Sequence, residues 1–143
     1  MKLFILAWFI GLIFILGVFY YLFSNAAKRY FKVPIEEVKP LLESSLKSFW
    51  VNFIMINSKH DKFLDEYSKY FKANIPFVFK IYFLPDCVVL TMLNKHAAVF
   101  RRNEWQFSKN GIFSYFTIEN DTAKYRIETG FRTKFLKEWL SMT

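Results

Sequence analysis

Cysteine, histidine and glycine are all scarce in this sequence, and each scarcity excludes a class of site. Cys87 is the single cysteine among 143 residues, so no disulfide can form within the chain, which fits a reducing compartment. The sequence contains no CxxC, HExxH or similar ligand spacing, so we expect no metal site. Two of its four glycines, Gly11 and Gly17, lie in an apolar run, and no glycine-rich phosphate loop is present.

Candidates for catalysis are equally few. His60 stands next to Asp61 and could act as a base, but neighbouring residues of a helix point about 100° apart, and a solvated helix start explains both. Cys87 opens an expected strand and is most simply a small core residue. We therefore expect no catalytic residue and no cofactor, and the chain is not expected to be an enzyme.

Charge is absent from residues 3–23, LFILAWFIGLIFILGVFYYLF. A helix of this length spans about 30 Å, the thickness of a bilayer's hydrocarbon core. The apolar region of a signal peptide is only about 7–15 residues long, although Ser24 and Ala26 do offer small residues at a cleavage spacing. Residues 1–27 are therefore expected to form an uncleaved transmembrane anchor rather than a cleaved signal or a buried helix.

The flanks of the apolar run carry only positive charge, since residues 1–32 contain no acidic residue. Positive flanks tend to stay on the cytoplasmic side, and more of them follow the run than precede it. We therefore expect the amino terminus outside and the carboxyl domain on the cytoplasmic side of a bacterial inner membrane, or on the matrix side of an organellar one. Residues 28–33 form a basic linker, and the expected membrane-interface residues are Tyr20, Tyr21, Lys28, Arg29 and Lys32.

Small residues recur within the apolar run. Ala7 and Gly11 form a small-xxx-small pair, which can let two membrane helices approach closely. This pair is a candidate packing site for a second copy of the chain or for another membrane subunit.

Residues 34–74 show a spacing typical of helices. Apolar residues from Ile35 to Phe53 recur at steps of three and four, and Pro40 predicts either a kink or a helix start. Ser58 and Asp61 resemble a capping box for a second helix, which Asn74 and Pro76 would end. The sequence thus predicts a helical hairpin.

From Pro76 onward, the spacing of the apolar residues changes to every second position. Six short segments rich in aromatic and branched residues are separated by polar turns, which predicts an antiparallel meander of about five to six strands. In the last segment, Ala123, Tyr125 and Ile127 should face inward. Residues 132–142 should form an amphipathic closing helix, so residues 34–143 are expected to be one small α+β domain. On topology alone, a half-barrel like that of pleckstrin-homology domains also fits.

The domain carries a modest positive excess. Beyond residue 32 the chain has 16 basic and 12 acidic residues. A patch for an anionic partner could form if the strands bring together four candidates, Arg101, Arg102, Lys124 and Arg126.

These observations favour a binding role. The first interpretation is a single-pass membrane protein whose domain mediates protein–protein interaction, as an accessory or scaffold subunit of a membrane complex. The alternative is a membrane-tethered module that senses or binds an anionic ligand, either a lipid headgroup or a nucleotide; an enzyme comes third. The expected partners are membrane lipids and other subunits of the complex. A flat apolar patch would favour the first interpretation, and a deep pocket with convergent polar groups the second.

Overall fold

The computed structural model describes residues 1–58, 70–110, 114–130 and 132–142. The chain divides into two compact units, Met1–Tyr30 and Phe31–Thr143. We describe each unit by itself.

The first unit is a single apolar helix, α1 (Lys2–Lys28). Its segment Lys2–Asn25 is long and apolar enough to cross a membrane, a property that a signal sequence near an amino terminus shares. The side chains of Tyr20 and Tyr21 are exposed near the carboxyl end of this segment.

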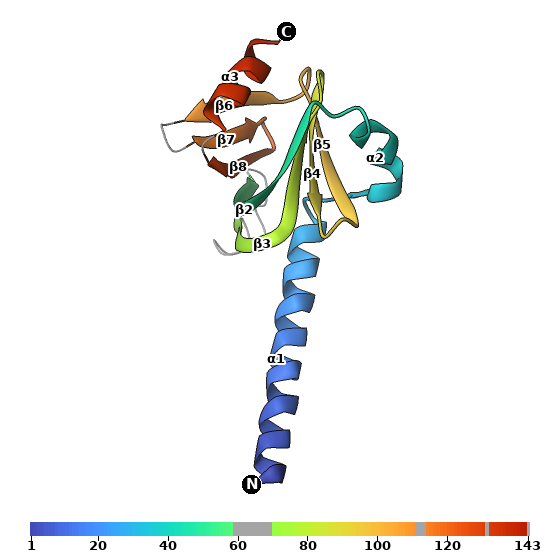
Figure 1. The fold of residues 1–143 in the computed structure, drawn as a ribbon, viewed down its shortest axis with the longest axis vertical. Coiled ribbons are helices and arrows are strands. Elements are labelled where there is room, and N and C mark those ends of the chain that lie inside the picture. Colours follow the sequence, from blue (N-terminus) through green and yellow to red (C-terminus); the bar gives the residue numbers. More distant parts are fainter. Residues whose placement is uncertain (59–69, 111–113, 131, 143) are drawn as a thin grey trace. The chain divides into compact units, whose positions relative to one another are not determined.

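The second unit is built on one antiparallel sheet of eight strands (Figure 1). Their order across the sheet is β1-β5-β4-β3-β2-β8-β7-β6, so two meanders, β2 to β5 and β6 to β8, meet where β8 pairs with β2. The strands are β1 (Val33–Pro34), β2 (Lys47–Ser58), β3 (Tyr70–Phe83), β4 (Cys87–Met92), β5 (His96–Arg101), β6 (Gln106–Asn110), β7 (Ser114–Glu119) and β8 (Ala123–Gly130).

The short link between β5 and β6 shows that this sheet is strongly curved. Six strand spacings separate these two strands in the sheet order, which would be about 29 Å in a flat sheet. The chain from Arg101 to Gln106 can span at most about 18 Å. The sheet therefore curls into a half-barrel, and Trp105 in this link packs its ring against Phe100 of β5 and Tyr125 of β8.

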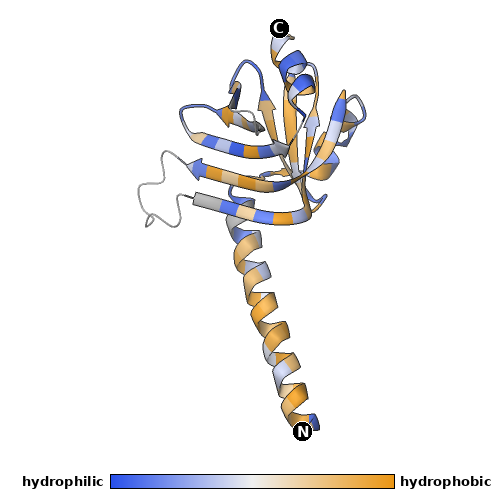
Figure 2. Cartoon of the chain, turned by 60° about the vertical axis from the view of Figure 1, so that its left-hand side comes forward, coloured by the Kyte–Doolittle hydropathy of each residue, from blue (hydrophilic) through white to orange (hydrophobic). Residues whose placement is uncertain are grey.

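The inner face of the half-barrel holds the main core. Hydrophobic and hydrophilic residues alternate along the strands (Figure 2), as expected when successive side chains point to opposite faces. The inner-face residues include Ile54, Ile56, Phe79, Ile81, Phe83, Leu90, Phe100, Phe116, Ile118, Tyr125 and Ile127, all of them buried.

Two short helices cover different parts of the sheet (Figure 1). On the inner side, α3 (Thr133–Ser141) buries Leu136 and Trp139, and the Trp139 ring lies 5.4 Å from that of Phe83. On the outer side, α2 (Ile35–Leu42) buries Ile35 and Val38 in a smaller cluster with Cys87, Val89 and Ala97 of β4 and β5.

The α+β class, the antiparallel sheet and the closing helix agree with the sequence-based prediction, although the sheet has more strands than the five to six expected. All six segments predicted as strands from Pro76 onward are strands. The alternation predicted for β8 is also confirmed, because Ala123, Tyr125 and Ile127 are buried while Lys124 and Arg126 are half-buried and Glu128 is exposed.

The predicted helical hairpin is wrong in its first half. The helix α2 starts at Ile35 and ends at Leu42, so Pro40 neither starts nor kinks a longer helix, and residues 47–58 form β2. The buried side chains of β2 shift from Phe49 and Val51 to Ile54 and Ile56, because the register is irregular between Val51 and Phe53. Because of this bulge, the buried residues Val51 and Ile54 are three positions apart instead of two. The spacing of the apolar residues in this strand therefore resembles that of a helix.

Most of the second predicted helix, residues 58–74, lies outside the described residues. At its two ends, Ser58 belongs to β2 and residues 70–74 belong to β3, so neither end is helical.

Candidate interaction surface

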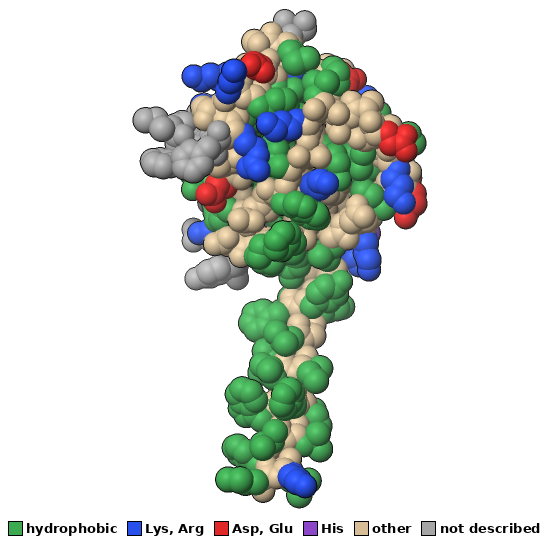
Figure 3. Space-filling model, viewed as in Figure 1, with side chains coloured by type: hydrophobic (Ala, Val, Ile, Leu, Met, Phe, Trp, Pro, Cys, Tyr) green, Lys and Arg blue, Asp and Glu red, His purple; other side chains and the backbone are tan. Residues whose placement is uncertain are grey.

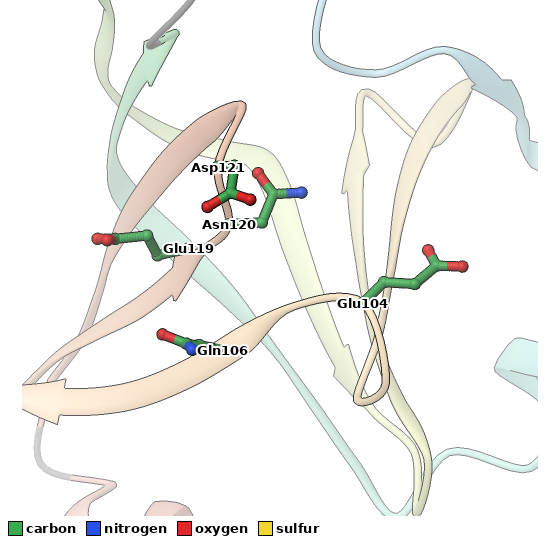
Figure 4. Close-up of a pocket in the computed structure, with 5 residues that line it drawn as sticks. All are labelled: Glu104, Gln106, Glu119, Asn120 and Asp121. Atoms are coloured by element: carbon green, nitrogen blue, oxygen red, sulfur yellow. The ribbon is translucent and has the colours of Figure 1, made fainter.

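A small acidic pocket lies beside the turn between β7 and β8. Its volume is about 200 Å³, and it is lined by Glu104, Gln106, Glu119, Asn120 and Asp121. Figure 4 shows the carboxylates of Glu104 and Glu119 directed away from each other. Among the described residues, no three acidic, histidine or cysteine side chains are grouped so that they could hold a metal ion.

Two side chains of this pocket, Asn120 and Glu119, are already engaged at the turn. The Asn120 Oδ1 atom accepts hydrogen bonds from the backbone N–H groups of Thr122 and Ala123 and from the Thr122 hydroxyl, at 2.7–3.0 Å. Glu119 forms an ion pair with Lys124 at 3.6 Å. The pocket is therefore explained by a polar turn, and it offers no convergent set of catalytic groups.

The outer face of the sheet has a different character where α2 does not cover it. On β2 and β3, the Trp50 ring lies 6.2 Å from the Phe77 ring in an edge-on arrangement. The Lys80 ammonium lies 5.4 Å above the ring of Trp50 and 5.2 Å from that of Tyr82. We call this group of Trp50, Phe77, Lys80 and Tyr82 the Trp50 cluster.

A second cluster, with two aromatic and two cationic side chains, crosses β3, β2, β8 and β7. The Lys72 ammonium lies 5.5 Å above the Phe53 ring, which lies 6.2 Å from Tyr115, and the guanidinium of Arg126 lies 5.6 Å above the Tyr115 ring. We call these four residues the Phe53 cluster. Figure 3 shows Lys and Arg side chains interspersed with hydrophobic ones on the face of the domain that it presents.

Two buried polar atoms in the Phe53 region lack a hydrogen-bond partner. They are Thr117 Oγ1 and Arg126 Nε, and their residues are directly opposite each other on β7 and β8. Buried polar groups in folded proteins are nearly always paired, so each such atom calls for an explanation.

Phe77 has an unusual backbone conformation. Its φ angle is 62°, in the left-handed region that bulky residues rarely adopt, and its side chain is 74% exposed. The register explains why: between the pairs Val51–Phe79 and Phe53–Asn74, β3 contains four intervening residues where β2 contains one. This bulge, residues 75–78, projects Phe77 and Ile75 from the sheet. Strained residues of this kind are concentrated at functional sites.

The four residues of the predicted anionic-partner patch lie in two separate places. Lys124 and Arg126 are neighbours on the outer face of β8, where Lys124 pairs with Glu119. Arg101 ends β5, and three strands separate β5 from β8 in the sheet. Whether any of these residues binds an anionic partner stays a prediction.

Arg102 has a structural role. Its guanidinium stacks 3.6 Å from the centre of the Trp139 ring, and it donates hydrogen bonds to the carbonyl oxygens of Trp139 and Pro85. Burial lowers the pKa of Arg102, and the nearby Asp86 opposes this shift. Arg102 thus fastens the end of α3 to the turn between β3 and β4.

The predicted residues of the membrane interface lie on both sides of the unit boundary. Tyr20, Tyr21 and Lys28 belong to α1, Arg29 follows it, and Lys32 is an exposed residue of the second unit. Of the Ala7–Gly11 pair, Gly11 leaves open space, because a Cβ atom there would meet nothing within 4 Å.

Among the described residues, Cys87 and His96 form no catalytic arrangement. Cys87 is buried under α2, and burial, aided by Asp86, raises the pKa of its thiol to about 11, so it is a poor nucleophile. His96 pairs with Pro34 at the edge of the sheet, while His60 and Asp61 lie outside the described residues.

Sequence reasoning missed the two exposed aromatic residues of this surface. Trp50 was hidden by the helical interpretation of β2, and nothing in the residue type of Phe77 signals a positive φ angle. The dipeptide Pro76–Phe77 was the available signal, because it breaks the alternation of β3.

Comparison of this chain with protein-family models, with curated proteins and with solved structures finds no match.

Proposed function

We propose that this chain is a single-pass membrane protein whose domain binds another protein, as an accessory or scaffold subunit of a membrane complex. The apolar helix α1 supports the anchor, and its purely basic flanks favour a cytoplasmic or matrix location for the domain. A reporter enzyme active only in the cytoplasm, fused after Thr143, should therefore be active.

The observation that carries the proposal is the outer face of the sheet. Aromatic and cationic side chains alternate across it in the Phe53 cluster. Tyr, Trp, Phe and Arg are the residues enriched in protein interfaces, and aromatic and Arg anchors contribute most of the binding energy there. The small acidic pocket offers no comparable set of groups, so a binding role is favoured over an enzymatic one.

The test is crosslinking at the outer face in the membrane of living cells. A photoreactive residue in place of Met55, which is opposite Arg126 on the outer face, should yield a discrete product with a partner. The same residue in place of Lys137, exposed on α3, is the control. Changing Tyr115 to Ser should abolish the Met55 product, and equal products from both positions would contradict the proposal.

A membrane-tethered module for an anionic ligand is the alternative. Arg126 on the outer face of β8 favours it, because a guanidinium group can bind a phosphate or carboxylate. Inorganic phosphate or a nucleotide should then raise the unfolding temperature of the full chain, and Arg126→Gln should remove the effect. Crosslinking at Met55 without any ligand effect would favour the protein partner.

A further inference from the structure

The chain connection limits how far the start of the second unit can lie from the end of α1. Phe31 is buried in the second unit with its ring 5.7 Å from that of Phe79, and only three Cα–Cα steps separate it from Lys28, the last residue of α1. Three steps span at most about 11 Å, whatever the orientation of the two units.

Three segments meet at this end of the domain. Val33 pairs with Ala97 of β5, and the Ile35 N–H donates a hydrogen bond to the Lys95 carbonyl at 3.0 Å. The Leu93 N–H donates to the Val78 carbonyl at 2.8 Å, which joins the β4–β5 turn to the bulge of β3. We call the segments 31–34, 75–78 and 93–95 the tethered rim.

The tethered rim presents apolar side chains at its surface. Phe77 is 74% exposed and Ile75 is 38% exposed, and Trp50, which packs edge-on against Phe77, is 43% exposed. All three non-glycine residues with positive φ that the structure describes, Phe77, Leu93 and Asn94, belong to this rim. Strained backbone thus holds an aromatic ring outward from the rim.

The charges around these apolar residues suit a bilayer surface. No acidic residue occurs between Glu66 and Asp86, a stretch that contains Lys72 and Lys80, and Lys95 is exposed in the rim itself. The Lys80 ammonium lies above the Trp50 ring. The amphipathic rings of tryptophan and tyrosine favour the headgroup region, and lysine side chains are attracted to an anionic leaflet.

We propose that the tethered rim is a lipid-binding surface, and that the Phe77 ring inserts into the interfacial layer of the membrane that α1 spans. The inference rests on the proposed anchor, because the short connection after Lys28 brings the rim to a bilayer only if α1 is embedded in one. Two attachments, the helix and the rim, would restrict how the domain tilts.

The test uses the full chain in vesicles of phosphatidylcholine with a minority of phosphatidylglycerol, with and without a lipid that carries a nitroxide quencher. The nitroxide is near the headgroup for labels in the second unit and near the end of an acyl chain for the label in the middle of α1. A fluorophore is attached to a cysteine introduced at exposed Pro76, at Phe14 of α1 or at Lys137 of α3. The buried Cys87 can stay, because its raised thiol pKa disfavours labelling. We expect strong quenching at Phe14 and Pro76, and quenching at Lys137 no greater than in vesicles that lack the nitroxide lipid.

The variant Phe77→Asn decides whether the ring itself makes the contact. Asparagine tolerates a positive φ angle, so this change removes the ring without adding backbone strain. In the Pro76-labelled chain it should reduce quenching to the level at Lys137.

Three outcomes would overturn the inference. Weak quenching at Pro76 with strong quenching at Phe14 would overturn it and leave the anchor intact. Strong quenching at Pro76 that Phe77→Asn does not change would mean that the rim is near lipid only because it is tethered. Weak quenching at Phe14 would overturn the anchor and the inference together.

Discussion

Trp139 holds the closing helix to the sheet in two ways. Its ring is completely buried and packs against Phe83, Phe107 and Phe116. Its indole N–H donates a hydrogen bond of 2.7 Å to the Leu84 carbonyl. Packing and hydrogen bonding should therefore make separate contributions to the stability of the domain.

Substitutions at Trp139 separate these two contributions. Trp139→Phe keeps an apolar ring but leaves the buried Leu84 carbonyl unpaired, which should cost about 1–3 kcal/mol. Trp139→Ala should cost about 3–5 kcal/mol. The measurement is the free energy of unfolding in urea, followed by the near-ultraviolet dichroism of the full chain in detergent. Lys137→Ala, an exposed change on the same helix, is the control and should cost little.

Cys87 makes stability depend on pH in the alkaline range. Because burial raises its pKa to about 11 from an ordinary value of 9.0, the folded state holds the thiol proton more tightly than the unfolded state does. The thiol's contribution to stability is therefore complete below pH 9 and is lost as the pH rises toward 11. Unfolding midpoints measured across this range should fall less in Cys87→Ala than in the parent chain. If the unfolding midpoints of the two proteins fell equally with pH, the thiol of Cys87 would not be the cause of the pH dependence.

At the residue scale, the burial of a side chain could be predicted from the sequence where the apolar residues follow a regular period. The inward placement of Leu136 and Trp139 was predictable because the amphipathic spacing of the closing helix is undisturbed. The roles of Arg102 and Phe77 were not, because they depend on the β3–β4 turn and on a bulge, which bring together residues that are distant or irregular in sequence.

At the element scale, bulges decide where the prediction fails. In β8 the alternation is continuous and was predicted correctly, whereas the irregularity between Val51 and Phe53 moves the buried positions of β2 from odd to even numbers. The pattern Phe49, Phe53, Ile56 then has helical steps of four and three. No local rule distinguishes this pattern from a helix, because the register is set by pairing with β3 and β8.

Substitutions at two nearby positions of β3, one in the bulge and one after it, should have different effects on stability. Phe77→Asn should leave the stability unchanged or increase it slightly, because it relieves a positive φ angle and loses little buried surface. Phe79→Ala should cost about 3–5 kcal/mol, because this ring is fully buried against Phe31. Thermal unfolding of the full chain in detergent measures both. Clear destabilisation by Phe77→Asn would show that the exposed ring has a packing role.

At the scale of the whole molecule, the proposed function assigns attachment to the first unit and binding to the second. The composition of α1 was readable from sequence because a membrane-spanning helix needs only length and the absence of charge. The outer face was not readable, because it exists only once β3, β2, β8 and β7 are aligned in register. Of the predicted patch, this alignment keeps Lys124 and Arg126 together and separates them from Arg101 and Arg102.

The charge on the outer face makes binding of the proposed partner sensitive to salt. Lys72, Lys124 and Arg126 lie on this face, and among them Lys124 is paired with Glu119. Attraction between exposed charges is screened beyond a Debye length of about 8 Å at physiological ionic strength and about 30 Å at 0.01 M. The affinity of the full chain in detergent for the partner crosslinked at Met55 should therefore fall as salt is raised over this range. Apolar contact alone would respond far less.

A pair of matched double variants assigns this effect to the outer face. Replacing Lys124 and Arg126 with Ser removes two positive charges from β8, and replacing Lys134 and Lys137 with Ser removes two from the exposed side of α3, which covers the inner face. Because an exposed charge pair contributes about 0.2–1 kcal/mol, the β8 variant should weaken binding roughly twofold to thirtyfold and flatten its salt dependence. The α3 variant has the same net charge and should bind like the parent chain. Equal loss in both variants would mean that only the overall charge of the domain attracts the partner, and no loss in either would identify the Phe53 and Tyr115 rings as the contact.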